Sequence, residues 1–260
     1  VPESRLLGNN SARTALDISY FRRTYGNFRV TDNRVLSAAD FDKFDFTAPS
    51  DPGLPDGGGY TVQGMYNLNP AKFGLASDNF VTLAGHYGKQ VEYWHGVDVN
   101  VTARYIKGLL VQGGTSTGRT ITDNCDLLAK VPEPLESRSA NSGLVTVANV
   151  VPFEYCHVAT NWLTQVKFLG SYTVPRLDVL VSGTVQSLPG PEFQANYALP
   201  TAVAARTLGR PLSGGAANVT VGLIKPGTQF GDRVNQVDVR IGKRLHLARM
   251  RETVSLDLYN

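Results

Sequence analysis

The feature that most constrains this chain is a period of two in its hydrophobicity. From residue 96 to residue 104, every second side chain is small or apolar and the side chains between them are polar. A strand places successive side chains on opposite faces of a sheet, so this alternation predicts a strand with one apolar and one polar face. The pattern recurs, more or less strictly, in residues 16–23, 108–120, 162–174, 177–187, 234–247 and 253–258.

The links between these seven predicted strands alternate in length. The short links are residues 105–108, 174–176 and 248–252, and the long links are residues 26–93, 121–161 and 188–233. Short turns at one end and long loops at the other are typical of outer-membrane barrels, whose tilted strands need about 9–11 residues to cross the bilayer. We therefore predict an all-β, antiparallel, up-and-down sheet of seven strands. It would be part of a transmembrane β-barrel, with short periplasmic turns and long extracellular loops.

Aromatic residues gather near the ends of the predicted strands. Tyr25, Phe28, Tyr93, Trp94 and Trp162 lie beside the long links, and Tyr105 and Tyr172 lie near the short turns. Two such belts are what the girdles of a membrane barrel require at its two interfaces. The alternative is that aromatic residues simply favour strand ends.

Charged side chains on the polar faces also bear on whether the sheet belongs to a membrane barrel or to a soluble domain. They are Asp98, Arg104, Lys167, Asp178, Asp238, Arg240 and Arg244. In a barrel they would face the lumen, where water and mutual pairing make charge tolerable. In a soluble sandwich they would form the solvent face of each strand. The alternation leaves both open, so a secreted β-sandwich that acts as a lectin-like or adhesion module is the alternative to the barrel.

The chain has two cysteines, Cys125 and Cys156, and they lie in one polar stretch. We expect a disulfide between them, with two unrelated thiols as the alternative. The bond would close a loop of about 30 residues, which the chain-entropy model values at roughly 3.5 kcal/mol. A disulfide would also indicate an oxidising compartment.

Catalysis, metal binding and nucleic-acid binding find little support. Residues 113–120 approach a phosphate-binding loop, but Arg119 replaces its lysine and no helix is expected to follow. The four histidines lack metal-ligand spacing and are expected to be ordinary polar residues. A net charge of +3 is too small to indicate nucleic acid. The remaining metal candidate is an acidic loop that could hold calcium but more simply is solvated: Asp40, Asp42, Asp45, Asp51 and Asp56. We predict that the protein is not an enzyme and has no cofactor.

Several segments together carry a family resemblance that covers essentially the whole chain. They are residues 17–23 with 25–28, 66–70, 96–99, 112–119, 165–172, 188–191 and 235–240. In their order and spacing they resemble the C-terminal part of TonB-dependent outer-membrane receptors, in the branch that carries an N-terminal carboxypeptidase-regulatory-like domain.

The resemblance implies a place in the bacterial outer membrane and energy-coupled uptake of a scarce solute such as an iron chelate, a cobalamin or an oligosaccharide. Receptors of this kind have barrels of about 22 strands closed by a plug. We therefore expect residues 1–260 to be part of one barrel domain, truncated at both ends and without the plug. The implied partners are outer-membrane lipid, the TonB complex acting through the absent plug, and the solute. The three long links are the expected recognition surface, with no single residue assigned.

Overall fold

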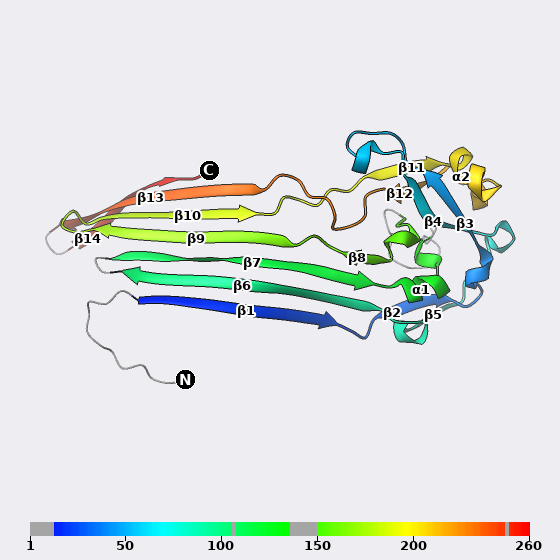
Figure 1. Cartoon of the computed structure of the whole chain (residues 1–260), viewed down its shortest axis with the longest axis horizontal. Coiled ribbons are helices and arrows are strands. Elements are labelled where there is room, and N and C mark those ends of the chain that lie inside the picture. The colour runs from blue at the N-terminus through cyan, green and yellow to red at the C-terminus, as the bar shows by residue number, and fades with distance from the viewer. Residues whose placement is uncertain (1–12, 106–107, 136–149, 248–249) are drawn as a thin grey trace.

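The computed structural model describes residues 13–105, 108–135, 150–247 and 250–260. Seven long strands form one antiparallel sheet in the order β1-β6-β7-β9-β10-β13-β14, and short β8 (His157–Ala159) pairs with the end of β7. Figure 1 shows the long strands side by side. Their bounds are β1 (Arg13–Tyr25), β6 (Val91–Tyr105), β7 (Leu109–Asp123), β9 (Leu163–Val174), β10 (Val179–Leu188), β13 (Val234–Leu247) and β14 (Met250–Leu258).

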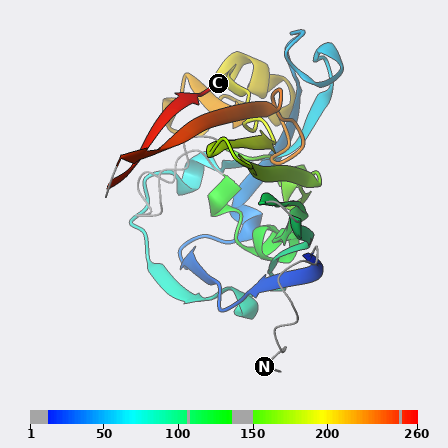
Figure 2. The same cartoon turned by 90° about the vertical axis from the view of Figure 1, so that its left-hand side faces the viewer.

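The predicted all-β, antiparallel, up-and-down sheet is confirmed. All seven predicted strands are present, and each one pairs with the next predicted strand along the chain. The sheet is open, with β1 and β14 at its two edges and no pairing between them among the described residues. Figure 2 shows that the strands follow an arc rather than a plane. No helix within the described ranges is long and apolar enough to span a lipid bilayer.

The register of the sheet collects the apolar residues of all seven strands on one face. Ile18 of β1 lies opposite Val99 of β6, which lies opposite Thr115 of β7. At the other side of the sheet, Ile241 of β13 lies opposite Leu256 of β14. Because the side-chain period is two, a slip of one residue in any pair would move its apolar set to the other face. The continuous match across six pairings defines an apolar face and a polar face for the whole sheet.

The apolar face of the long sheet is not covered by a second layer in the described part of the chain. Ile18 is 66% exposed and Leu256 is 62% exposed. Among the described residues, Ala103 is the only buried hydrophobic residue that the seven long strands contribute. The long sheet therefore has no hydrophobic core of its own.

The three long links fold together at one end of the sheet into a unit that we call the cap, residues 26–90, 124–135, 150–162 and 189–233 (Figure 1). It contains three small antiparallel pairs, β2-β5, β3-β4 and β11-β12. Its strands are β2 (Arg29–Asn33), β3 (Phe41–Thr47), β4 (Thr61–Leu68), β5 (Asn79–Leu83), β11 (Asn196–Pro200) and β12 (Asn218–Gly222). Its helices are α1 (Cys125–Lys130) and α2 (Thr201–Leu208).

The hydrophobic core of the protein lies in this cap. Its largest cluster combines Phe44 and Val62 from the first link, Val150 from the second, and Leu199 and Val221 from the third. The sequence predicted polar, turn-rich loops here, and that description is incomplete. The apolar residues that meet in this core come from three separate links and short strands, so no single window shows a period.

Polar contacts also tie the links to one another. Arg210 of the third link pairs with Asp42 of the first, with Nη2 2.5 Å from Oδ2. Arg210 Nη1 also donates to Asn67 Oδ1 at 2.7 Å. The expected disulfide is present between Cys125 and Cys156, whose Cα atoms are 4.9 Å apart. It holds α1 against the end of the second link.

Candidate functional site

The polar face of the sheet contains two neighbouring hollows that share Asp98. The larger, which we call the aromatic hollow, has a volume of about 700 Å³. The smaller, which we call the polar hollow, has a volume of about 430 Å³. A third hollow, of about 280 Å³, lies farther along the same face over β10 and β13. All three open on the polar face.

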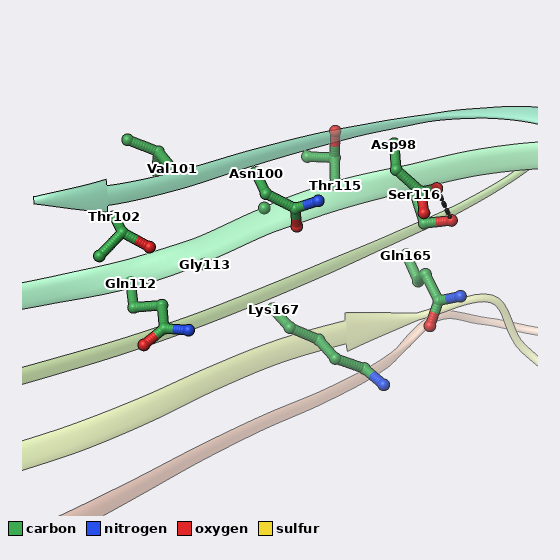
Figure 3. A pocket seen from close by; sticks show the side chains of 11 residues that line it. Asp98, Asn100, Val101, Thr102, Gln112, Gly113, Thr115, Ser116, Gln165 and Lys167 are labelled. Carbon is green, nitrogen blue, oxygen red and sulfur yellow. Dashed lines mark hydrogen bonds between the residues drawn. The ribbon is translucent and has the colours of Figure 1, made fainter. Parts of the chain in front are cut away.

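The polar hollow is formed by the neighbouring strands β6, β7 and β9. The register aligns Asp98 with Ser116 and Gln165, and it aligns Gly114 with Asn100 and Lys167. Figure 3 shows that Asn100, Gln112, Gln165 and Lys167 project to one side of the sheet, whereas Val101 and Thr115 project to the other. Ser116 Oγ donates a hydrogen bond to Asp98 Oδ1 at 2.6 Å. The hollow therefore offers amide, hydroxyl, ammonium and carboxylate groups to a polar ligand.

The aromatic hollow lies at the cap end of β1, β6 and β7, and its walls combine rings with charges. Phe21 is 48% exposed and Tyr25 is 44% exposed. The register places Phe21 opposite Gly96, and Tyr25 opposite Glu92. Trp94, opposite Arg23, supplies a third ring. The residues that line the hollow are Phe21, Arg22, Arg23, Tyr25, Glu92, Trp94, Asp98 and Thr120, of which Arg22 belongs to the apolar face by its strand position.

Two glycines let Trp94 lie against the sheet. Gly96 and Gly118 are directly opposite each other on the polar face. A Cβ atom at Gly118 would be 2.3 Å from Trp94 Cζ2, and one at Gly96 would be 2.6 Å from Trp94 Cη2. Any other residue at these positions would push the ring away. The glycine pair therefore sets the indole flat on the backbone, with its other side available to a ligand.

This arrangement suits a ligand that has both an apolar face and polar edges. Ligand sites are commonly lined by aromatic rings with a few placed polar groups that fix orientation. Here the rings of Trp94, Phe21 and Tyr25 supply the contact area. Neighbouring Glu92 and Asp98 accept hydrogen bonds, and Arg23 donates them. The polar hollow continues this surface along the strands beyond Asp98.

The charged residues predicted on the polar face are found there, with one exception. Arg240 makes two hydrogen bonds to Asp257 across β13 and β14, at 2.5 and 2.9 Å. Asp238 accepts hydrogen bonds from Gln236 at 2.9 and 3.1 Å. The residues whose strand position places them on the polar face are Asp98, Arg104, Lys167, Asp238, Arg240 and Arg244.

Asp178 is the exception. It was expected within a strand of residues 177–187, but β10 begins at Val179. Asp178 has a φ of 48° and belongs to the turn between β9 and β10, because a left-handed residue cannot continue the strand. Its Oδ2 lies 3.1 Å from His246 Nε2, so it closes the turn end of the sheet.

The aromatic belt beside the long links is divided between the two faces. Tyr93 and His95 lie on the apolar face with Trp162, whereas Trp94 lies on the polar face. His95 was expected to be an ordinary polar residue, and its position among apolar-face rings corrects that. His95 is two residues before Val97 and four before Val99 in β6, so its side chain lies on the same face as theirs.

The structure disperses the acidic residues that could have formed a calcium site. Asp42 pairs with Arg210, Asp40 pairs with Lys72, and Asp45 accepts a hydrogen bond from the backbone of Gly64. In residues 13–105, 108–135, 150–247 and 250–260, no group of three or more His, Cys, Asp or Glu residues could hold a metal ion. Residues 113–120 lie inside β7, where extended backbone cannot cradle a phosphate.

Sequence reasoning did not find the aromatic hollow. In the sequence, Phe21, Tyr25 and Trp94 belong only to the family resemblance or to the strand-end aromatic residues. The available signal was a tryptophan two residues before Gly96, but the partner Gly118 becomes its neighbour only through strand pairing. No protein-family model, curated protein or solved structure matches this chain. A function has to be inferred from the geometry of the sheet and its hollows.

Proposed function

We propose that this chain forms part of the wall of a bacterial outer-membrane β-barrel, in a TonB-dependent receptor that takes up a scarce solute. The observation that carries the proposal is the uncovered apolar face, which extends over seven long antiparallel strands. In water, that surface would be far larger than the apolar patches of ordinary monomers. Against lipid tails it needs no covering layer, because alternate residues of a barrel strand face the membrane.

The polar face takes the role of lumen wall in this proposal. Asp98, Lys167 and Arg240 then contact water rather than hydrocarbon, where their charge is tolerated. The aromatic hollow lies at the cap end of this wall, where an incoming solute would first meet the strands. An iron chelate, a cobalamin or an oligosaccharide each combines apolar surface with hydrogen-bonding edges, as the hollow requires.

The position of the cap supports an orientation. The links at the cap end are long and folded, and the β9–β10 link at the other end is a four-residue turn, residues 175–178. Long links on the outside and short turns in the periplasm are the arrangement of outer-membrane barrels. Energy coupling by the TonB complex would act through a plug, which this sheet would surround together with further strands.

The alternative of a secreted β-sandwich has less support. A sandwich needs a second sheet about 10 Å from the first, with the two apolar faces interdigitated. Among the described residues, the small sheets of the cap pack with one another at one end and leave the apolar face of the long sheet open. We therefore do not propose the sandwich as a second function.

Fluorescent labels on neighbouring residues of β6 test the proposal. Val99→Cys and Asn100→Cys differ by one position and place a bimane label on opposite faces of the same strand. The chain is reconstituted into phosphatidylcholine vesicles that carry doxyl-labelled acyl chains, with its disulfide kept oxidised. We expect lipid quenching at residue 99 and iodide quenching at residue 100. Equal quenching of both labels by iodide, with none by lipid, would refute the membrane assignment.

The aromatic hollow is tested separately with candidate solutes. In a Trp162→Phe background, Trp94 is the only tryptophan of the chain. We expect its emission to be quenched in a saturable way by one member of a panel of ferric chelates, cobalamin and oligosaccharides. Tyr25→Ala and Phe21→Ala should weaken that binding, and Arg104→Ala, at the far end of the polar face, should not. Loss of binding in the Arg104 variant alone would contradict the assignment of this site.

A further inference from the structure

A row of basic side chains crosses the apolar face near the cap. Arg22 of β1 lies directly opposite His95 of β6, and His95 lies directly opposite Arg119 of β7. Trp162, immediately before β9, continues the row, with its ring centroid 5.0 Å from that of His95. We call the three basic residues, together with the Trp162 ring that continues them, the basic row. Toward the turns, the rest of this face is mostly apolar or small, and among the described residues of the long strands its charged side chains there are Lys243 and Glu252.

Aromatic contacts hold the two guanidinium groups in place. The Cζ atom of Arg22 lies 4.5 Å from the centroid of the Tyr93 ring. The Cζ atom of Arg119 lies 5.0 Å from the Trp162 ring. Arg119 Nε also donates a hydrogen bond to His95 Nε2 at 3.2 Å, so that nitrogen of His95 is unprotonated in this arrangement. Cation–π contacts fix the direction of each cation while leaving N–H donors available.

Carboxylates that could neutralise the two arginines lie elsewhere. Glu92 and Asp98 are on the polar face, and none of the ion pairs of the described residues involves Arg22 or Arg119. Asp123 is on the same face but four residues farther along β7, where it contacts His157 at 3.1 Å. Four strand residues span about 13 Å. The basic row is therefore a cationic site without an anion of its own.

The location of the row matters for its chemistry. A charge on the lipid-facing side of a barrel is costly at the bilayer midplane and nearly neutral at the interface. Tyrosine and tryptophan favour the headgroup level, and the basic row has both beside it. If the proposed function holds, the row lies where the phosphates of membrane lipids are found.

We propose that the basic row binds a terminal phosphate monoester of an anionic membrane lipid at the cap-side interface. Each guanidinium offers a planar pair of N–H donors that matches two phosphate oxygens. Arg22 and Arg119 lie on either side of His95, two strand spacings or about 10 Å apart, so a phosphate placed over His95 would lie between the two guanidinium groups. The rings of Tyr93 and Trp162 contact the glycerol or sugar part of the headgroup. This inference rests on the membrane location proposed above.

Two pairs of substitutions that remove the same charge distinguish binding at the basic row from general electrostatic attraction to the vesicle. Arg22→Gln with Arg119→Gln removes two charges from the apolar face. Arg104→Gln with Arg244→Gln removes two charges from the polar face, one on β6 and one on β13. The full chain is mixed with vesicles of phosphatidylcholine alone, or mixed with phosphatidic acid or with phosphatidylserine, and the bound fraction is measured by flotation. The serine lipid carries a phosphodiester and a carboxylate, so it tests whether negative charge without a phosphate monoester suffices.

We expect phosphatidic acid to raise wild-type binding above that seen with either other vesicle. An arginine near an anionic surface changes the partition constant about fivefold, so the apolar-face pair should lose roughly thirtyfold. The polar-face pair should keep wild-type preference. Arg22→Lys with Arg119→Lys keeps the charge without the planar fork, and it should lie between wild type and the glutamine pair.

Other outcomes overturn the proposal in distinguishable ways. Equal losses in the two glutamine pairs would mean that net charge, and not the basic row, governs binding. Equal enhancement by phosphatidic acid and phosphatidylserine would refute a site for a phosphate monoester. A wild-type chain that enters phosphatidylcholine vesicles but does not respond to phosphatidic acid would overturn this inference alone. A chain that enters no vesicle would overturn the membrane assignment as well.

Discussion

Replacing Gly118 with alanine tests whether the glycine pair sets Trp94 into the aromatic hollow. The new Cβ atom would lie 2.3 Å from Trp94 Cζ2, 2.7 Å from Trp94 Cε2 and 3.0 Å from the carbonyl oxygen of His95. Favourable carbon–carbon contacts occur at about 3.5–4.0 Å, so the indole has to retreat by at least about 1 Å. The His95 carbonyl belongs to the paired strand and cannot yield without loss of register.

The size of the effect follows from this geometry. Inserting one methyl group into a filled space costs about 1–3 kcal/mol when neighbours must move. The indole is the neighbour that can move, so we expect the Trp94 ring to turn away from the sheet. The aromatic hollow would then lose the ring that lies flat on its backbone. Gly170→Ala is the matched control, because a Cβ atom at Gly170 in β9 meets nothing within 4 Å. Its effect should stay within about 0.5 kcal/mol.

Tryptophan fluorescence measures this displacement directly. In a Trp162→Phe background, Gly118→Ala should shift the Trp94 emission to longer wavelength and increase its quenching by acrylamide. Denaturant unfolding of the same proteins gives the free energy cost. If Gly118→Ala and Gly170→Ala give the same emission and the same stability, Trp94 does not depend on the glycine pair and the described position of its ring in the hollow is wrong.

Three further predictions concern the cap. Replacing both cysteines of the disulfide with alanine should lower the free energy of unfolding by about 3.5 kcal/mol, measured with and without reductant, since the bond closes 31 residues of separation. Leu199→Ala should cost about 2–5 kcal/mol in denaturant unfolding, because Leu199 is fully buried, while exposed Leu256→Ala in β14 should cost far less. Tyr87 donates to Asp32 Oδ2 at 2.6 Å, and this bond raises the pKa of Tyr87 to about 12 from an ordinary value of 10.0. The contribution of this hydrogen bond to the free energy of unfolding is therefore complete below pH 10 and is lost as the pH rises toward 12. Tyr87→Phe should remove this loss from a profile of stability measured against alkaline pH.

The long sheet could be predicted because its signal is local. Each strand shows its alternation within a single window, as residues 96–104 do most clearly. The alternation also fixes the register, since only pairings that keep apolar residues on one face preserve the two surfaces. The alternation of short and long links then gives antiparallel neighbours. The expected disulfide needed only two cysteines in one polar stretch.

The cap could not be predicted in the same way. Its strands are short, and the residues that share its core, such as Phe44, Val150 and Leu199, come from three links. No local window contains both partners of such a contact. The turn at Asp178 was missed because the residue fits the alternation of β10, and only the backbone φ of 48° removes it from the strand.

By itself, the sequence determined seven strands, their order and the division of each into an apolar and a polar face. Those properties follow from a two-residue period, which is a property of neighbouring residues. Only the tertiary structure decided which side chains from different strands meet. Gly118 lies under Trp94, and Arg22 stands in line with Arg119, because strand pairing brings together residues about 24 and 97 positions apart in the chain. The same long-range pairing packed the three links into one core, since burial of apolar surface rewards contacts whatever their separation in sequence.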